Sequence, residues 1–238
     1  MDYQQFPTTG RLASNMNLEL SNLKDKILFE QAEVYFYVVE TIKNQNGYFL
    51  QTGSAPNFQG DMVSLCTCKH RMRTSMDTED WVDKWIAGFS GVAAGNRNNA
   101  LVYLMKVGWA FKSQMKLWFS DKIPEETKQA KSAQVNKFGD IYKPKDQISN
   151  EFSAQSYFHP VEGHVHCNND GWHNDINYVG YSDRKPALLI GDPGYSFLWN
   201  RPMIFYKPIK NDPDHLTEGQ KKSNVQRLLN EQLREQRP

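Results

Sequence analysis

The chain has 238 residues, of which 39% are apolar and 13% are aromatic, and its 28 Lys and Arg nearly balance its 27 Asp and Glu. This length and apolar content are enough for a globular protein with a full hydrophobic core. The near-neutral charge excludes a general polycationic coat for nucleic acid. No apolar run approaches the roughly 18 residues that span a bilayer, so we expect a soluble protein without membrane contact.

The charge is unevenly distributed along the chain. Residues 61–145 contain 14 Lys and Arg against 9 Asp and Glu, whereas each flank is acidic by two charges. An anionic partner is therefore expected to dock on the central third.

The cysteine content indicates a reducing compartment. Cys66, Cys68 and Cys167 make an odd number, and no secretory signal pattern is visible in the sequence. We therefore expect free thiols in a cytoplasmic protein.

Alternating patterns of apolar residues predict both helices and strands. A helix is predicted over residues 17–32, and a β-rich run follows at 34–39. Further strands are predicted at 62–67, 85–89, 101–107, 187–190 and 203–206, and further helices at 111–119, 124–133 and 217–235. Residues 138–185 are rich in Gly, Asn, Asp, His and aromatics, with little periodicity, which is typical of a long functional loop region. The predicted fold is mixed α/β (α+β), with one central mixed sheet flanked by helices.

This pattern divides the chain into three parts. An N-terminal extension and helix (1–32) precede a core domain (33–210), and a helical extension (211–238) ends the chain. Leu228, Leu229 and Leu233 of that extension need a surface to cover them, so the C-terminal helix is a candidate docking element for a protein partner.

A dense group of cations follows a turn-forming run at residues 53–60. In an extended segment, Lys69, Arg71 and Arg73 would project from one face and could grip successive phosphates. The alternative is an edge strand that carries protective charge. Asn57, directly after a proline, is a candidate reader of a base edge or positioner of water, although Pro-Asn is also ordinary turn chemistry.

Two aspartates are candidates for acid–base chemistry. Asp140 directly follows a glycine at the entry of the irregular region, where it would activate water or stabilise a cationic transition state, or simply cap a turn. Asp192 lies in a Gly-Asp-Pro-Gly run after the predicted strand 187–190, and the end of a buried strand is where a sheet presents polar groups. This run also resembles the water-activating loop of uracil-DNA glycosylases.

Cysteine and histidine residues also invite comparison with zinc sites. The candidates are Cys66, Cys68, His70, His164, His166, Cys167 and His173. No CxxC pair occurs among them, and their spacings differ from those of common structural zinc sites. We therefore expect no metal and no cofactor, with the thiols buried and the histidines lining a polar pocket.

The order of these segments resembles the nucleotide-modification-associated domains over about residues 33–206. The resemblance depends mainly on Ser54-Ala55-Pro56-Asn57-Phe58-Gln59-Gly60, on Cys66-Thr67-Cys68-Lys69-His70-Arg71-Met72-Arg73 and on Gly139-Asp140-Ile141-Tyr142. It implies work on modified DNA bases, in phage genomes or in bacterial defence against phages.

The resulting hypothesis is a DNA glycosylase that flips a hypermodified or glucosylated base out of phage DNA and excises it, leaving an abasic site. Asp140 or Asp192 would hold the attacking water, and His159 would polarise the departing base. The candidate contacts to DNA are Asn57, Phe58, Lys69, Arg71, Arg73, Tyr142, Tyr157 and Trp172. The alternative is a non-catalytic reader of modified DNA that recruits a partner. A transferase that builds the modification ranks lowest, because the chain has neither a phosphate-cradling Gly loop nor a dinucleotide fingerprint.

Overall fold

The computed structural model describes residues 2–146, 150–165, 171–207, 220–222 and 224–235. Its strands are β1 Val34–Val39, β2 Ile42–Gln45, β3 Tyr48–Gln51, β4 Ser64–Leu65, β5 Trp85–Ser90, β6 Leu101–Phe111, β7 Leu188–Leu198, β8 Ile204–Tyr206, β9 Gln220–Lys222 and β10 Leu233–Glu235. Its α-helices are α1 Gly10–Ser14, α2 Leu20–Lys26, α3 His70–Arg73, α4 Gln114–Trp118, α5 Glu125–Ala130, α6 His173–Asn177 and α7 Val225–Arg227. Short 3₁₀ turns are η1 Thr78–Trp81, η2 Ala154–Ser156 and η4 Tyr181–Asp183, and η5 Leu228–Gln232 is a π-helical turn.

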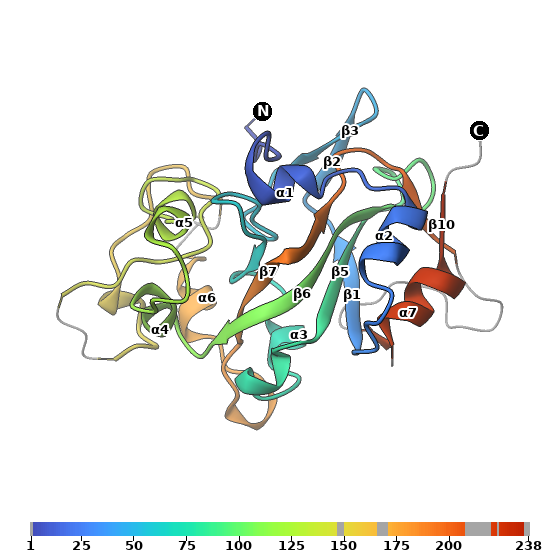
Figure 1. Cartoon of the computed structure of the whole chain (residues 1–238). Coiled ribbons are helices and arrows are strands. Elements are labelled where there is room, and N and C mark those ends of the chain that lie inside the picture. The colour runs from blue at the N-terminus through green and yellow to red at the C-terminus, as the bar shows by residue number, and fades with distance from the viewer. Residues whose placement is uncertain (1, 147–149, 166–170, 208–219, 223, 236–238) are drawn as a thin grey trace.

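One mixed sheet forms the centre of the fold, with the strand order β4-β7-β6-β5-β1-β9. β1 and β5 pair in parallel, whereas the other neighbouring strands pair antiparallel. The sheet and the surrounding helices in Figure 1 confirm the predicted mixed α/β class. A parallel pair requires a crossover connection, and the chain makes it through the β2–β3 hairpin, β4 and α3.

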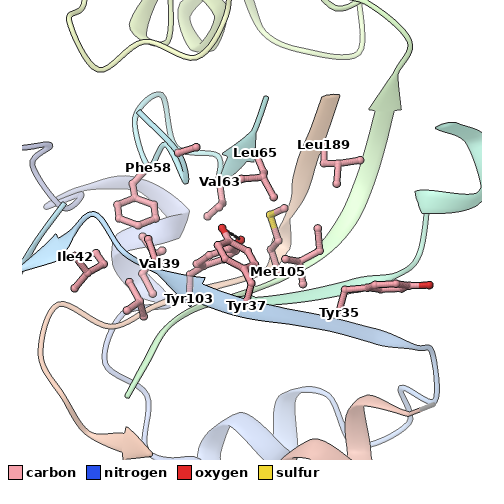
Figure 2. Packing of buried hydrophobic residues seen from close by; sticks show 14 of the residues in the cluster. Tyr35, Tyr37, Val39, Ile42, Phe58, Val63, Leu65, Tyr103, Met105 and Leu189 are labelled. Carbon is pink, nitrogen blue, oxygen red and sulfur yellow. Dashed lines mark hydrogen bonds between the residues drawn. The ribbon is translucent and has the colours of Figure 1, made fainter. Parts of the chain in front are cut away.

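Alternation along β1 divides the core between the two faces of the sheet. Val34 and Phe36 belong to one apolar cluster, and Tyr35 and Tyr37 belong to another. α2 and α7 lie beside β1 and β5 in Figure 1 and contribute to the first cluster. The crossover packs on the second face, where Figure 2 shows Phe58 close to the aromatic residues of the sheet. The candidate motifs are thus held against the tyrosine-bearing face.

The C-terminal segment differs from the predicted single helix over 217–235. Residues 217–219 and 223 lie outside the described part of the chain, and the described rest forms β9, α7, η5 and then β10, which pairs with β8. Leu228, Leu229 and Leu233 are buried in the cluster that covers the first face. The expectation that these leucines lack a cover within the chain is therefore wrong, because the sheet already covers them, and a protein partner for this segment stays a prediction.

The Gly-Asp-Pro-Gly run does not end a strand. β7 pairs with β6 on both sides of this run, with Gly191 opposite Val107 and Ser196 opposite Met105. Residues 192–195 bulge out between these pairs, and Asp192 Oδ1 accepts a hydrogen bond from the backbone of Gly194 (2.7 Å). The expectation of a strand end at Asp192 is wrong, because the strand resumes after a bulge.

The irregular region between residues 138 and 185 contains only short helical elements in its described part, η2, α6 and η4. Figure 1 shows α4, α5 and α6 gathered at one end of the sheet. Within the described residues, no helix combines the length and apolar character that crossing a membrane requires.

Candidate functional site

The cationic segment forms a helix instead of a strand. Cys68 and Lys69 both have left-handed backbone conformations, with φ of 55° and 48°, and α3 begins directly after them. Such conformations are costly for residues other than glycine and occur often at functional sites. The expectation of an extended segment is wrong, because the left-handed turn leads the chain into a helix whose Arg73 amide bonds Lys69 O (3.0 Å).

As a result, the three cations occupy three different environments. Lys69 is half-buried, with Nζ 5.1 Å from the ring centroid of Tyr37. Arg71 is exposed. Arg73 is fully buried and donates hydrogen bonds to Cys68 O (2.9 Å) and Ala187 O (2.7 Å). The expected clamp with all three cations on one face is therefore not formed, and Arg73 has no surface from which to grip a phosphate.

A hydrogen-bonded chain connects α3 to α6. Asp175 Oδ1 lies 3.0 Å from His70 Nε2, and Asp175 Oδ2 accepts a hydrogen bond from Tyr142 Oη (2.9 Å). The backbone amide of Cys68 also donates to Asp175 Oδ1 (3.3 Å). The side chain of Asp175 is 3% exposed, whereas that of His70 is 18% exposed. We call His70, Tyr142 and Asp175 the Asp175 cluster.

The surroundings of Asp175 keep the Tyr142 hydroxyl and the Cys68 thiol protonated. Burial, followed by the charge of Asp175, raises the pKa of Tyr142 well above its usual value. The same two causes raise the pKa of the Cys68 thiol to about 12. Tyr142 is thus a stable donor to Asp175, and Cys68 is a poor nucleophile. Because the carboxylate fixes one imidazole nitrogen, this arrangement can orient His70 for proton transfer.

A second polar cluster lies entirely inside the protein. Asn57 Nδ2 donates to Phe138 O (2.8 Å), and Asn57 Oδ1 accepts from Lys131 Nζ (2.9 Å) and from the Gln59 amide (2.9 Å). All hydrogen-bonding atoms of this amide face protein groups, and Asn57 is fully buried. Asn57 therefore holds the turn-forming run at residues 53–60 in place, and its side-chain amide has no free edge that could read a base.

Asp140 completes this buried group. Its Oδ2 accepts a hydrogen bond from the Cys66 amide (3.3 Å), and burial raises its pKa although the charge of Lys131 opposes the shift. Burial also lowers the pKa of Lys131 to about 8. Within the described structure, neither Asp140 Oδ1 nor Ser64 Oγ has a well-oriented hydrogen-bond partner. Ser64 is nevertheless close enough to act against the rise in the pKa of Asp140. We call Asn57, Lys131 and Asp140 the Asp140 cluster; it has no solvent-exposed member.

The remaining candidate for proton transfer, His159, lies in the irregular region. His159 Nδ1 donates to Pro160 O (2.8 Å), and its ring packs edge-on against Trp172 (5.5 Å between centroids). No hydrogen bond joins it to Asp140 or Asp192 within the described residues. The structure therefore does not bring the three predicted catalytic residues into one hydrogen-bonded group.

The predicted base-stacking aromatics are core residues. Tyr142, Tyr157 and Trp172 are buried together in one apolar cluster of the irregular region. Phe58 is buried in a different cluster, where it packs on Phe6 (5.0 Å between centroids). None of these four rings is available at the surface in this structure.

Two other tyrosines, which the sequence did not single out, lie at the surface beside α3. Tyr178 stacks on His70, with 4.7 Å between the ring centroids and 21° between the planes. Tyr181 is 91% exposed. Together with Arg71 and neighbouring residues they line an open cleft of about 630 Å³. No sequence signal marks this pair, because their role depends on α3, which lies about 105 residues earlier in the chain.

The described residues contain no group of three or more His, Cys, Asp or Glu side chains that could hold a metal ion. Cys66 and Cys68 form no disulfide bond within the part of the chain that the structure describes. His166 and Cys167, which the sequence comparison with zinc sites included, lie outside the described residues.

Comparison with known families gives one match. A protein-family model described as nucleotide modification associated domain 2 matches residues 31–185, and its range includes α3, both polar clusters and the cleft. No curated protein and no solved structure matches the chain.

Proposed function

The chain belongs to the nucleotide modification associated domain 2 family, and from that premise we propose that it hydrolyses the N-glycosidic bond of a modified base in DNA. Its role is linked to modified nucleotides, and the proposed substrate is phage DNA with a hypermodified or glucosylated base. The product would be an abasic site, which serves in defence against the phage.

The observation that supports this proposal best is the hydrogen bond between His70 and the buried Asp175. A general base needs a fixed orientation and some access to substrate, and His70 has both, because its ring is partly exposed. Asp140 has no such access. We therefore assign proton transfer to His70, with Asp175 as the residue that positions it.

The proposed reaction follows from this geometry. His70 takes a proton from a water molecule as the water oxygen bonds to C1′ of the sugar and the C1′–N bond breaks. The bonding electron pair leaves with the base, which receives a proton from the imidazolium. The negative charge of Asp175 stabilises the positive charge that develops on the sugar during the displacement, and then the imidazolium until it gives its proton to the base. Atoms and charge thus balance without a cofactor.

The first test is the release of base from DNA. The protein is incubated with phage DNAs that carry different base modifications, and alkali then reveals abasic sites as strand breaks. We expect breaks in at least one modified DNA and none in unmodified DNA of the same sequence. The His70→Gln variant should lose about 10²- to 10⁴-fold in rate, the usual worth of a positioned base. If no modified DNA acquires alkali-labile sites, the proposal is wrong.

The second candidate function is a reader that binds modified DNA without reacting. The highly exposed Tyr181, next to the cation Arg71, favours it, because stacking and charge are sufficient for binding. A protein that binds modified DNA but never produces abasic sites would fit the reader and exclude the enzyme.

A further inference from the structure

The loop that follows α6 is held firmly against α3. Its two ends are joined by a hydrogen bond from the Gly180 amide to Arg184 O (2.8 Å), and Arg184 Nε bonds Asp77 Oδ1 (2.8 Å). Gly180 packs so closely on Thr74 that an added Cβ would lie 2.4 Å from Thr74 Oγ1. Only glycine allows this approach, so the loop packs directly on Thr74 at the C-terminal end of α3.

This loop presents a large aromatic side chain to solvent. Tyr181 is 91% exposed, at the start of the 3₁₀ turn η4. Ser182 and Asp183, which follow it, both have left-handed conformations, with φ of 58° and 57°. These conformations cost free energy in residues other than glycine. A fold that holds a tyrosine outward at such a cost is typical of a binding surface.

The opposite wall of the cleft is polar and cationic. Arg71 is exposed, and within the described residues its guanidinium has no ion pair or hydrogen bond. Ser75 adds an exposed hydroxyl group to the lining, whereas the hydroxyl of Thr74 is buried and donates to Arg71 O (3.1 Å). A cation, a serine hydroxyl and an aromatic ring around about 630 Å³ match a ligand with a phosphate and a flat base. This volume is within the range of small-ligand sites.

The stacking partner must be an unpaired base. In a duplex, both faces of each base are covered by its neighbours, so an aromatic side chain can stack only on a base that has been flipped out or is single-stranded. We propose that the cleft between α3 and residues 178–181 binds one unpaired nucleotide, with its base on Tyr181 and its phosphate on Arg71. This inference rests on the proposed function, because it names where that nucleotide binds.

Tyr178 connects this cleft to the Asp175 cluster. It lines the cleft and its ring also stacks on His70. A nucleotide in the cleft would therefore contact the same ring that packs on the imidazole of His70. Two sources supply the same chemistry, a free nucleotide or an unpaired nucleotide within a DNA strand, and the experiment separates them.

The test is a binding titration by fluorescence anisotropy. The probes are a short single strand with one glucosylated cytosine, the same strand in a duplex, and the free monophosphate as a competitor. Tyr181→Ala and Arg71→Ala remove the two proposed contacts, and Tyr48→Ala, at an exposed tyrosine on the β2–β3 hairpin, is the matched control.

We expect the single strand to bind more tightly than the duplex. Tyr181→Ala should weaken this binding by about 5- to 100-fold, as expected for the loss of one stacked base, and Tyr48→Ala should leave it unchanged. A monophosphate that competes as well as the strand identifies the free nucleotide as the source, and a much weaker one identifies the strand. Equal binding by Tyr181→Ala, Arg71→Ala and Tyr48→Ala would overturn the proposal.

The outcome also separates this inference from the proposed function. If base release occurs but Tyr181→Ala binds and reacts like the parent, the enzyme stands and the cleft is the wrong site. If binding depends on Tyr181 but no base is ever released, the nucleotide site in the cleft is supported and the proposed glycosylase activity is wrong.

Discussion

The Asp140 cluster and the Asp175 cluster are each built around a buried aspartate, yet they differ in access to solvent. Asp140 lies beside Ser64, Cys66 and Lys131, all of them buried. Asp175 holds His70, whose ring is partly exposed and stacks on Tyr178 at the edge of a cleft. On the proposed function, burial and a shifted pKa therefore do not by themselves mark a catalytic carboxylate. What matters is whether a partner of that carboxylate can reach a substrate.

Removal of Arg73 should have the largest effect on stability, because its cation faces both clusters. Its guanidinium is fully buried, donates to two backbone carbonyls and interacts with the charges of Asp175 and Asp140. We expect Arg73→Ala to lower the free energy of unfolding by about 3–5 kcal/mol, since it leaves buried groups unpaired. Urea denaturation measures this change. A loss below about 1 kcal/mol would mean that Arg73 does not hold the clusters together.

Lys131→Met breaks the Asp140 cluster alone. The substitution removes the cation next to Asp140 and two hydrogen bonds to Asn57. It should reduce the free energy of unfolding by about 2–3 kcal/mol, with DNA binding per folded molecule unchanged. The matched control is Lys122→Met, at an exposed lysine. If DNA binding falls while the free energy of unfolding is unchanged, the Asp140 cluster takes part in DNA recognition.

Arg71→Ala tests the difference between two arginines of the same short helix, α3, because Arg71 is exposed and Arg73 is buried. We expect almost no change in melting temperature and a loss of about 1.5–3 kcal/mol in the free energy of DNA binding, the worth of one charge-assisted contact. The slope of log affinity against log salt should fall by about 1. An Arg71→Ala protein that melts early but binds normally when folded would assign Arg71 a structural role instead.

The smallest expected effect is the pH dependence of the free energy of unfolding, which depends on Lys131 of the Asp140 cluster. The pKa of Lys131 is about 8 in the folded protein against 10.5 for an ordinary lysine. Between these values the unfolded chain binds more protons, so the free energy of unfolding rises with pH, by at most about 1.4 kcal/mol per pH unit.

Other buried groups reverse this trend at higher pH. Burial raises the pKa values of Cys66 and Cys68 above 9.0, and those of Tyr37 and Tyr103 above 10.0, so the unfolded chain loses these protons first and stability then falls. Denaturation curves from pH 7 to 11 should therefore show a maximum near pH 9 in the parent. Lys131→Met should lose the rise and keep the fall; a rise that survives the substitution would show that another group causes it.

The sequence predicted elements well where the apolar pattern is local. The runs at 34–39 and 85–89 correspond to β1 and β5, because buried strands need continuous apolar residues. It was less successful where a few residues redirect the chain. The left-handed Lys69 turns an apparent strand into α3, and the bulge at 192–195 lets β7 continue beyond a turn-like run.

The candidate site was harder to predict than the fold, for a spatial reason. The sequence indicated Asp140 as a catalytic residue and Tyr142 as a contact to DNA, but it gave no sign that His70 meets Asp175 across 105 residues. Their contact exists only because α3 and α6 are packed together by the irregular region. In the same way, exposure distinguishes Tyr181 from the buried Tyr157, and a single sequence does not contain that information.

The most direct test of the account compares Asp175→Asn with Asp140→Asn in the assay for base release. Both changes remove one negative charge with little change in shape, and Asp25→Asn, at an exposed position in α2, controls for the loss of charge. We predict that Asp175→Asn lowers the rate by about 10²- to 10⁴-fold, whereas Asp140→Asn keeps the rate of the parent per folded molecule. The reverse result, with loss of base release in Asp140→Asn and normal release in Asp175→Asn, would contradict the assignment of the chemistry to the Asp175 cluster.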